Sequence, residues 1–277
     1  MGIFKLSVTP ITENLRLDKI ELENYPPFSN IVEIFPNKKL TVYVGSNGTG
    51  KTRFVDAIRS GFGLPPTYNE FEKTGNSNSI NGKPTIKLET NFDSSLITKD
   101  NHFLFFYDSD DEFHELIKFF ESLSSEIKEK ILLKSSDTLK LILNNKFEDY
   151  VKEMSINKSR LVLSTIHGED HNPGRCQIIL MGLSLLLSLR QHFAPNSFLI
   201  LDSIFHNFAA KNKIILAKVL SQFTFQTILL VTDVEFLAGT SEIKSVKDTF
   251  DESGIDYEIR TFKITGDDMT RSIVEYK

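Results

Sequence analysis

The sequence predicts an α/β fold with a mixed, largely parallel central sheet, and three observations favour it. A glycine-rich segment at residues 45–52 joins an apolar strand to a helix. Apolar strands alternate with helical segments over residues 173–231. Several short strands with proline turns between them precede the glycine-rich segment. Alternating strands and helices are typical of α/β proteins, and the consecutive short strands predict an antiparallel portion near the N-terminus.

The glycine-rich segment fits the phosphate-binding pattern G-x-x-x-x-G-K-[ST]. An apolar strand at residues 40–44 runs into it, and apolar residues at helical spacing follow over residues 53–58. A chance glycine-rich turn is disfavoured by this strand and helix on its two sides. The pattern therefore predicts a P-loop NTPase whose nucleotide-binding residues are Gly45, Ser46, Asn47, Gly48, Thr49, Gly50, Lys51 and Thr52.

The chemistry of phosphate binding accounts for these residue types. Glycines allow successive backbone N–H groups to turn inward, and the helix N-terminus adds a partial positive charge. Lys51 can reach the β- and γ-phosphates, and the Thr52 hydroxyl can hold Mg²⁺. We therefore expect a nucleoside triphosphate and Mg²⁺ as cofactors.

The remaining elements follow from apolar periodicity and from glycine and proline breakers. We predict a helical region over residues 112–154 and a buried helix over residues 173–190. An exposed loop is expected at residues 61–84, and a further helix at residues 209–220. The predicted strands are 4–8, 19–22, 31–35, 40–44, 85–92, 102–107, 198–201, 227–231, 257–264 and 272–276. We expect one domain, 1–277, with a helical subdomain at about 110–175.

Composition bounds the function. The 277 residues carry a net charge of −5, so the whole-protein charge does not favour nucleic-acid binding, although a local basic patch stays open. The single cysteine, Cys176, excludes an intramolecular disulfide and suits a reducing cytosol. We see no secretion signal, and the apolar stretch at residues 178–189 is too short to cross a bilayer. We expect a cytoplasmic protein without a membrane partner.

Hydrolysis of a nucleotide requires a carboxylate near Mg²⁺. Two apolar strands end in an aspartate, one at Asp202 and one at Asp108. We favour Asp202 because its neighbours form an ordered set of motifs, while Asp108 is followed by an acidic turn. Both assignments stay open at the level of sequence.

These motifs together resemble an ABC-type ATPase of the SMC/RecF/DNA-repair branch. The phosphate loop has that branch's Gly-x-Asn-Gly-x-Gly-Lys form, and residues 20–25 are similar to its opening strand and turn. Residues 172–177 stand where the family carries its signature sequence, and Asp202 stands at the Walker B position. The resemblance implies an ABC-ATPase-like head with a helical insertion, and adenine as the base, hence ATP with Mg²⁺ held by Thr52 and Asp202.

The signature position has physical support. Asn172 is a suitable N-cap, Pro173 suits the first helical position, and such a helix N-terminus binds anions. In the family this end meets the γ-phosphate held by a second subunit, which implies an ATP-dependent dimer with Asn172 and Gly174 contacting nucleotide. Alternatively, these residues only start a core helix.

Departures from the family pattern concern catalysis. Ser203 stands where a glutamate usually follows the Walker B aspartate, and Asp233 stands where the family places its switch histidine. Serine cannot carry a negative charge at pH 7, and Asp233 would repel a nearby γ-phosphate. We therefore expect slow or absent hydrolysis, with Asp202, Ser203 and Asp233 as the catalytic positions. Asp233 or His206 is a candidate to position water instead.

Three functions are compatible with these observations. The first is an SMC/RecF-like ATPase whose ATP-dependent dimerisation or partner docking acts as a switch in DNA repair or antiviral defence, with DNA as a candidate ligand. The second is a non-hydrolysing regulatory subunit of an effector complex. The third, a transporter ATPase subunit, is least favoured because the standard signature and switch histidine are absent from the sequence. A partner protein is expected to carry the output chemistry.

Overall fold

The computed structural model describes most of the chain. The described residues are 10–65, 83–108, 112–143, 151–157, 160–165, 168–170, 175–202, 204, 213, 216, 219–220, 225–237, 245–252, 254–265 and 270–275. The predicted strand at residues 4–8 and the signature residues Asn172 and Gly174 lie outside this set, as does Ser203.

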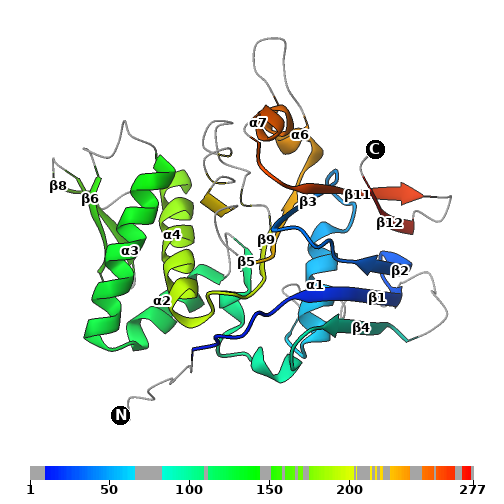
Figure 1. Ribbon diagram of the computed structural model, residues 1–277, viewed down its shortest axis with the longest axis horizontal. Helices are drawn as coiled ribbons and strands as arrows, with labels where there is room; N and C mark the ends of the chain where they lie inside the picture. The colour runs from blue at the N-terminus through cyan, green and yellow to red at the C-terminus, as the bar shows by residue number, and fades with distance from the viewer. Residues whose placement is uncertain are drawn as a thin grey trace.

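A six-stranded sheet forms the centre of the molecule (Figure 1). Its order is β12 (Thr270–Glu275), β11 (Glu258–Thr265), β3 (Leu40–Val44), β10 (Thr227–Val231), β9 (Leu199–Asp202) and β5 (Phe106–Asp108). All pairs are parallel except β11 with β12. The predicted mixed, largely parallel sheet is therefore confirmed. Its inner strands β3, β9 and β10 are buried at every residue, as their largely apolar sequences indicate.

A second, three-stranded antiparallel sheet confirms the predicted N-terminal β portion. Its order is β2 (Phe28–Ile34), β1 (Leu17–Tyr25) and β4 (Thr85–Thr90). From Ile31 to Ile34 on β2 the buried residues alternate with exposed ones, which is the period-2 pattern of a strand with one face on the core. Glu33 occupies one of the buried positions and receives a hydrogen bond from the Tyr43 hydroxyl at 2.7 Å. This contact joins the two sheets.

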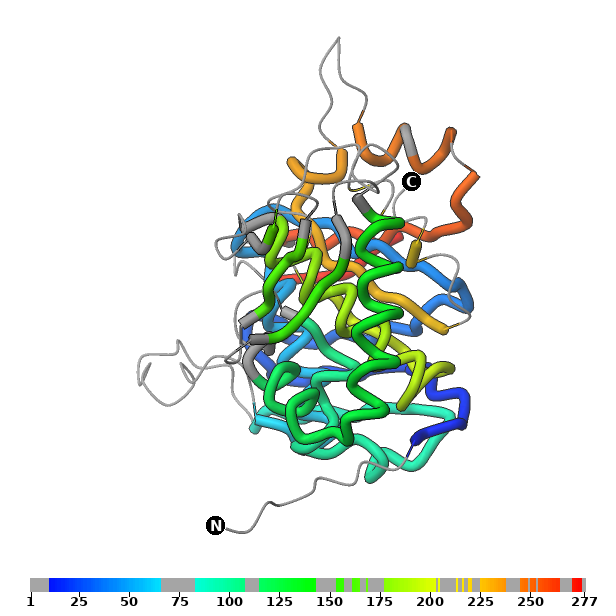
Figure 2. The backbone as a smooth tube through the Cα atoms, turned by 90° about the vertical axis from the view of Figure 1, so that its left-hand side faces the viewer, coloured from blue at the N-terminus to red at the C-terminus, as the bar shows by residue number. Residues whose placement is uncertain are grey.

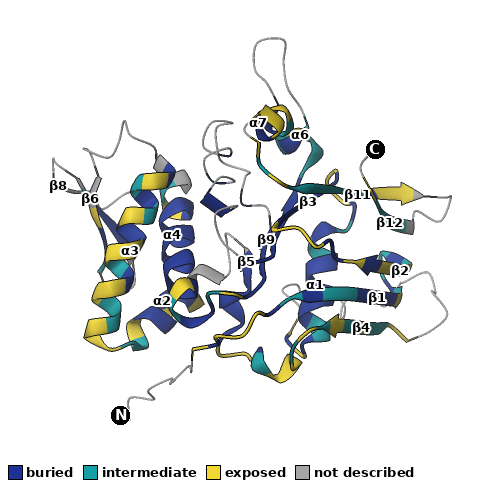
Figure 3. Cartoon of the chain, viewed as in Figure 1, coloured by how far each residue is buried: buried dark blue, intermediate teal, exposed yellow. Residues whose placement is uncertain are grey.

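Helices cover one side of the central sheet, as Figures 1 and 2 show. They are α2 (Glu112–Ser122), α3 (Ser125–Leu143) and α4 (Arg175–Phe193). Helix α4 is buried from Ile179 to Arg190, which confirms the prediction of a helix that is apolar nearly all round (Figure 3). Its two inner serines, Ser184 and Ser188, donate to carbonyls one turn earlier and so need no outside partner.

A buried arginine fixes α4 to the strand that ends in Asp202. The Arg190 guanidinium donates to the carbonyls of Leu104 and Ser197 and lies 4.5 Å from the centre of the Phe225 ring. Ser197 comes two residues before β9. The carbonyl and ring contacts offset part of the cost of burying this cation.

Two sequence-based expectations about this half of the chain are wrong. The helical region does not continue to residue 154, because α3 ends at Leu143 and a small antiparallel sheet follows. Its strands are β6 (Val151–Asn157), β7 (Arg160–Thr165) and β8 (Gly168–Asp170), which pair antiparallel. The predicted strand at residues 102–107 begins as a 3₁₀ turn, His102–Leu104, and only then becomes β5. The Asn101 side chain holds the chain bent before this turn, because it accepts from the Thr98 amide and donates to the Leu96 carbonyl.

The remaining predicted strands and the helix after the phosphate loop are confirmed. Helix α1 spans Lys51–Gly61. The C-terminal part adds two short helices, α6 (Asp233–Phe236) and α7 (Val246–Glu252), before the β11–β12 hairpin. The predicted helix at residues 209–220 falls largely outside the described residues.

Candidate nucleotide-binding site

The phosphate loop lies between the carboxyl end of β3 and the start of α1. Two of its glycines have positive φ, 81° at Gly48 and 97° at Gly50, which other residues rarely adopt. A Cβ at Gly50 would lie 2.9 Å from Phe28, and one at Gly45 would lie 2.5 Å from the Thr49 hydroxyl. The tight curvature of the loop therefore depends on these glycines.

Aromatic rings form a floor beneath the loop. Phe54 on α1 lies 5.6 Å from both Tyr43 and Phe262 and 6.3 Å from Phe28, measured between ring centres. These four residues, which we call the aromatic floor, come from α1, β3, β11 and β2. The floor is buried and holds the loop on a rigid base.

Lys51 folds back onto the loop. Its amine donates to the carbonyls of Gly45 at 2.6 Å and Ser46 at 3.0 Å. Burial lowers the pKa of the Lys51 amine, and three nearby carboxylates oppose that shift. They belong to Asp202, Glu235 and Asp233. The loop thus carries a cation that is held within the fold, with acidic groups around it.

Thr52 and Asp202 are brought together across 150 residues of sequence. The Thr52 hydroxyl donates to Asp202 Oδ2 at 3.0 Å, and Asp202 is buried at the end of β9. Asp108 pairs with Asp202 in the sheet but lies on β5, one strand further from the loop. The hydrogen bond of the Thr52 hydroxyl therefore goes to the aspartate that the order of motifs favours.

The turn after β10 lies between the phosphate loop, which follows β3, and Asp202, which ends β9. The Gly45 amide donates to the Val231 carbonyl at 3.2 Å, which ties this turn to the loop. Asp233 begins α6, is partly buried and accepts a hydrogen bond from the Val234 amide at 3.1 Å. The structure thus places Asp233 at the same sheet edge as Lys51 and Asp202.

The sequence reasoning missed two residues near the phosphate loop, Glu235 and Arg271. Glu235 and Thr232 form a capping box, in which each side chain accepts from the other's backbone amide. The Thr-x-x-Glu spacing is a known helix-start signal and could have drawn attention to Glu235. Arg271 on β12 donates to the Gly48 carbonyl from Nε at 3.2 Å and from Nη2 at 3.1 Å. Nothing in the sequence marks Arg271, which is 223 residues away from Gly48.

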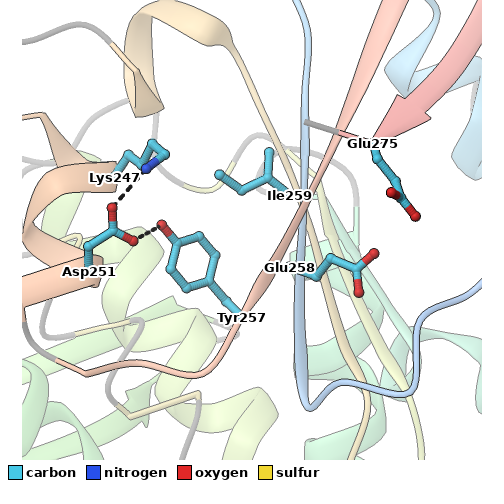
Figure 4. Close-up of a pocket in the computed structure, with 6 residues that line it drawn as sticks. All are labelled: Lys247, Asp251, Tyr257, Glu258, Ile259 and Glu275. Atoms are coloured by element: carbon cyan, nitrogen blue, oxygen red, sulfur yellow. Dashed lines mark hydrogen bonds and ion pairs between the residues drawn. The ribbon is translucent and has the colours of Figure 1, made fainter. Parts of the chain in front are cut away.

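A separate cleft opens at the other end of the central strands (Figure 4). It has a volume of about 540 Å³ and is lined by Lys247, Asp251, Tyr257, Glu258, Ile259 and Glu275. Asp251 accepts from Lys247 at 2.7 Å and from the Tyr257 hydroxyl at 2.6 Å. Glu258 pairs with Thr41 near the amino end of β3, so this cleft is distinct from the phosphate loop at the carboxyl end.

No described helix is both long and apolar enough to cross a bilayer. The described part of the chain also holds no group of three or more histidine, cysteine, aspartate or glutamate side chains placed to bind a metal ion.

Comparison with known proteins identifies the class. The family model for the AAA domain matches residues 19–263, and the chain belongs to this family. A comparison with curated protein sequences gives no match.

The fold is that of an SMC head. The head bound to the C-winged helix domain of ScpA superposes with a TM-score of 0.59 at 15% identity, over 94% of this chain and 97% of that one. The SMC head domain from Thermotoga maritima gives 0.53 at 17% identity, over 95% and 99%. A Pyrococcus furiosus head with an extended coiled coil, bound to the C-terminal domain of ScpA, gives 0.58 at 12%, over 95% and 96%. The expected P-loop NTPase head with an SMC-like fold is confirmed.

Proposed function

We propose that this chain is an ATP-binding ATPase of the SMC/RecF type, which acts as a switch through ATP-dependent dimerisation or partner docking in DNA repair or in defence against foreign DNA. The hydrogen bond between Thr52 and Asp202 carries the proposal. It joins the phosphate loop to a buried carboxylate, which is the donor set that Mg²⁺ bound to a triphosphate requires.

The residues present fit a magnesium nucleotide. The loop amides and Lys51 would hold the phosphates, and Thr52 with Asp202 would hold Mg²⁺. The bound ion would neutralise charge on the phosphates. The tight glycine turns support this fit, because a Cβ at Gly45 or Gly50 would collide with neighbouring side chains.

We propose that hydrolysis is slow. Ser203 replaces the carboxylate that would follow Asp202, and Asp233 replaces a residue that would be neutral or cationic. The three carboxylates near Lys51 would leave an excess of negative charge around a γ-phosphate. Asp233 is the candidate to position water, since it starts α6 at the same sheet edge as Asp202.

A partner is part of the proposal. Two of the SMC heads with the same fold were solved with a domain of ScpA bound. In the present chain, Asn172 and Gly174 would contact nucleotide held by a second copy, as the resemblance to ABC-type ATPases implies. The alternative function, a regulatory subunit that binds nucleotide without hydrolysing it, is favoured by Ser203. A transporter ATPase subunit is the least favoured function.

Two measurements on the purified protein test the proposal. ATP turnover is measured with and without double-stranded DNA, and molecular mass is measured with ATP, with ADP and without nucleotide. DNA-stimulated turnover supports the repair or defence switch, and ATP-driven assembly without turnover supports the regulatory subunit. If calorimetry with magnesium nucleotide gives no heat, both functions are wrong.

A further inference from the structure

The C-terminal hairpin contacts the phosphate loop at two points. Phe262 on β11 lies beneath Gly45, where an added Cβ would come within 2.9 Å of it. Arg271 on β12 donates from two guanidinium nitrogens to the Gly48 carbonyl, at 3.2 and 3.1 Å. The last sheet strand therefore contacts the tip of the loop directly.

The strand register explains why Arg271 faces the loop. Arg271 pairs with Ile264 across the antiparallel hairpin, and paired residues share one face of a sheet. Ile264 lies two residues after Phe262, so both have the loop-facing orientation of the strand. Lys263 lies between them, and its exposed side chain belongs to the opposite face.

The position of the guanidinium has an electrostatic consequence. The Gly48 carbonyl belongs to the loop that would surround the phosphates, so the Arg271 guanidinium would lie beside a bound triphosphate and attract its negative charge. Lys51 is buried and already donates to two loop carbonyls. Arg271 supplies a second cation from outside the loop, and its two donors restrain Gly48, where φ is 81°.

We propose that Arg271 is a positioning residue of the nucleotide site, which holds the tip of the phosphate loop and strengthens triphosphate binding through its charge. This inference rests on the proposed nucleotide binding. It makes the β11–β12 hairpin part of the site, although the hairpin lies more than 200 residues beyond the loop in sequence.

Calorimetric titration with MgATP tests the inference on the full chain. The test variants are Arg271→Ala and Arg271→Lys. Lys263→Ala is the matched control, because it removes one positive charge from the opposite face of the hairpin. Lys51→Ala gives the affinity that remains when the lysine of the phosphate loop is lost. A charged hydrogen bond at a partly exposed site predicts about five- to tenfold weaker binding for Arg271→Ala. Arg271→Lys is expected to recover about half of this loss on a logarithmic scale, and Lys263→Ala to bind like the parent protein.

Titrations at low and high ionic strength distinguish the effect of the Arg271 charge on ATP affinity from a purely structural effect of the side chain. At 1 M salt the Debye length falls to about 3 Å, so the difference between the parent protein and Arg271→Ala should shrink. Melting temperatures without nucleotide should match within the error of the measurement. Equal affinity of Arg271→Ala and the parent protein overturns the inference and leaves nucleotide binding intact. Absence of binding in the parent protein itself overturns the proposed function, and the role of Arg271 with it.

Discussion

Replacing Asp202 with asparagine should remove the part of the ATP affinity that depends on Mg²⁺ and leave the part that does not. Asparagine keeps the size of the side chain and an oxygen that can accept the Thr52 hydroxyl, now found 3.0 Å from Asp202 Oδ2. The negative charge is the main property lost. Lys51 and the loop amides are unchanged by this substitution, so binding of nucleotide without metal should persist.

The magnitude follows from the buried position of Asp202. Two unit charges about 4 Å apart interact with about 4 kcal/mol at an effective dielectric constant of about 20. Because Mg²⁺ keeps several water ligands that compensate in part, we expect a net loss of about 2 kcal/mol, or roughly thirtyfold in affinity. The fold should lose less, about 1 kcal/mol, because the hydrogen bond to Thr52 is retained.

Calorimetry with ATP in excess Mg²⁺ and in excess chelator measures this difference. The parent protein should bind more tightly with Mg²⁺, and Asp202→Asn should show little difference between the two conditions. Thr52→Val should have a similar effect, and the double variant should lose little more, because both side chains would act on one ion.

Asp108→Asn is the matched control. It changes the aspartate that pairs with Asp202 on the neighbouring strand. If Asp108→Asn abolishes the magnesium effect and Asp202→Asn does not, the assignment of the carboxylate is wrong. If neither variant changes it, the metal is held elsewhere.

Three further predictions concern the loop, the catalytic position and the buried glutamate. Lys51→Ala should weaken ATP binding by at least tenfold in the same titration, since a charged contact to phosphate is lost, and near-parental affinity would contradict its role. Ser203→Glu should raise steady-state ATP turnover because it restores a carboxylate after Asp202; unchanged turnover would argue against a missing base. Burial raises the pKa of Glu33, while Tyr43 and Arg260 oppose the shift. The stability that this group contributes is therefore full below the ordinary glutamate pKa and is lost as pH rises through the raised pKa. Denaturant unfolding at several pH values should show that Glu33→Gln reduces this decline. If the free energy of unfolding changes with pH in the same way in the variant and the parent protein, the reasoning is wrong.

Much of the fold could be predicted because its signals are local. The strand Leu40–Val44, the loop and α1 are adjacent in sequence, and each has a pattern with one physical interpretation. The sheet β6–β7–β8 was missed because a short apolar run such as residues 161–163 is compatible with either a helix or a strand. The 3₁₀ turn before β5 was missed because Asn101 bonds its own neighbours, and this contact overrides the strand preference of the aromatic run.

The site could be predicted only in part, because some of its contacts join residues that are far apart in the sequence. Asp202 and Asp108 both end an apolar strand, and only the strand order and the contact with Thr52 distinguish them. Glu235 had a capping signal that was not used. Arg271 had none, because its contact with Gly48 depends on how the C-terminal hairpin packs against β3.

The aromatic floor has a consequence for synthesis of the protein. Phe28, Phe54 and Phe262 meet under the loop, although they are far apart along the chain. A ribosome-bound chain that has exposed the phosphate loop but not yet β11 would lack one of these rings. We therefore expect that a growing chain binds ATP tightly only after the β11–β12 hairpin has emerged, so that nucleotide would stabilise this fold only from that stage of synthesis onward.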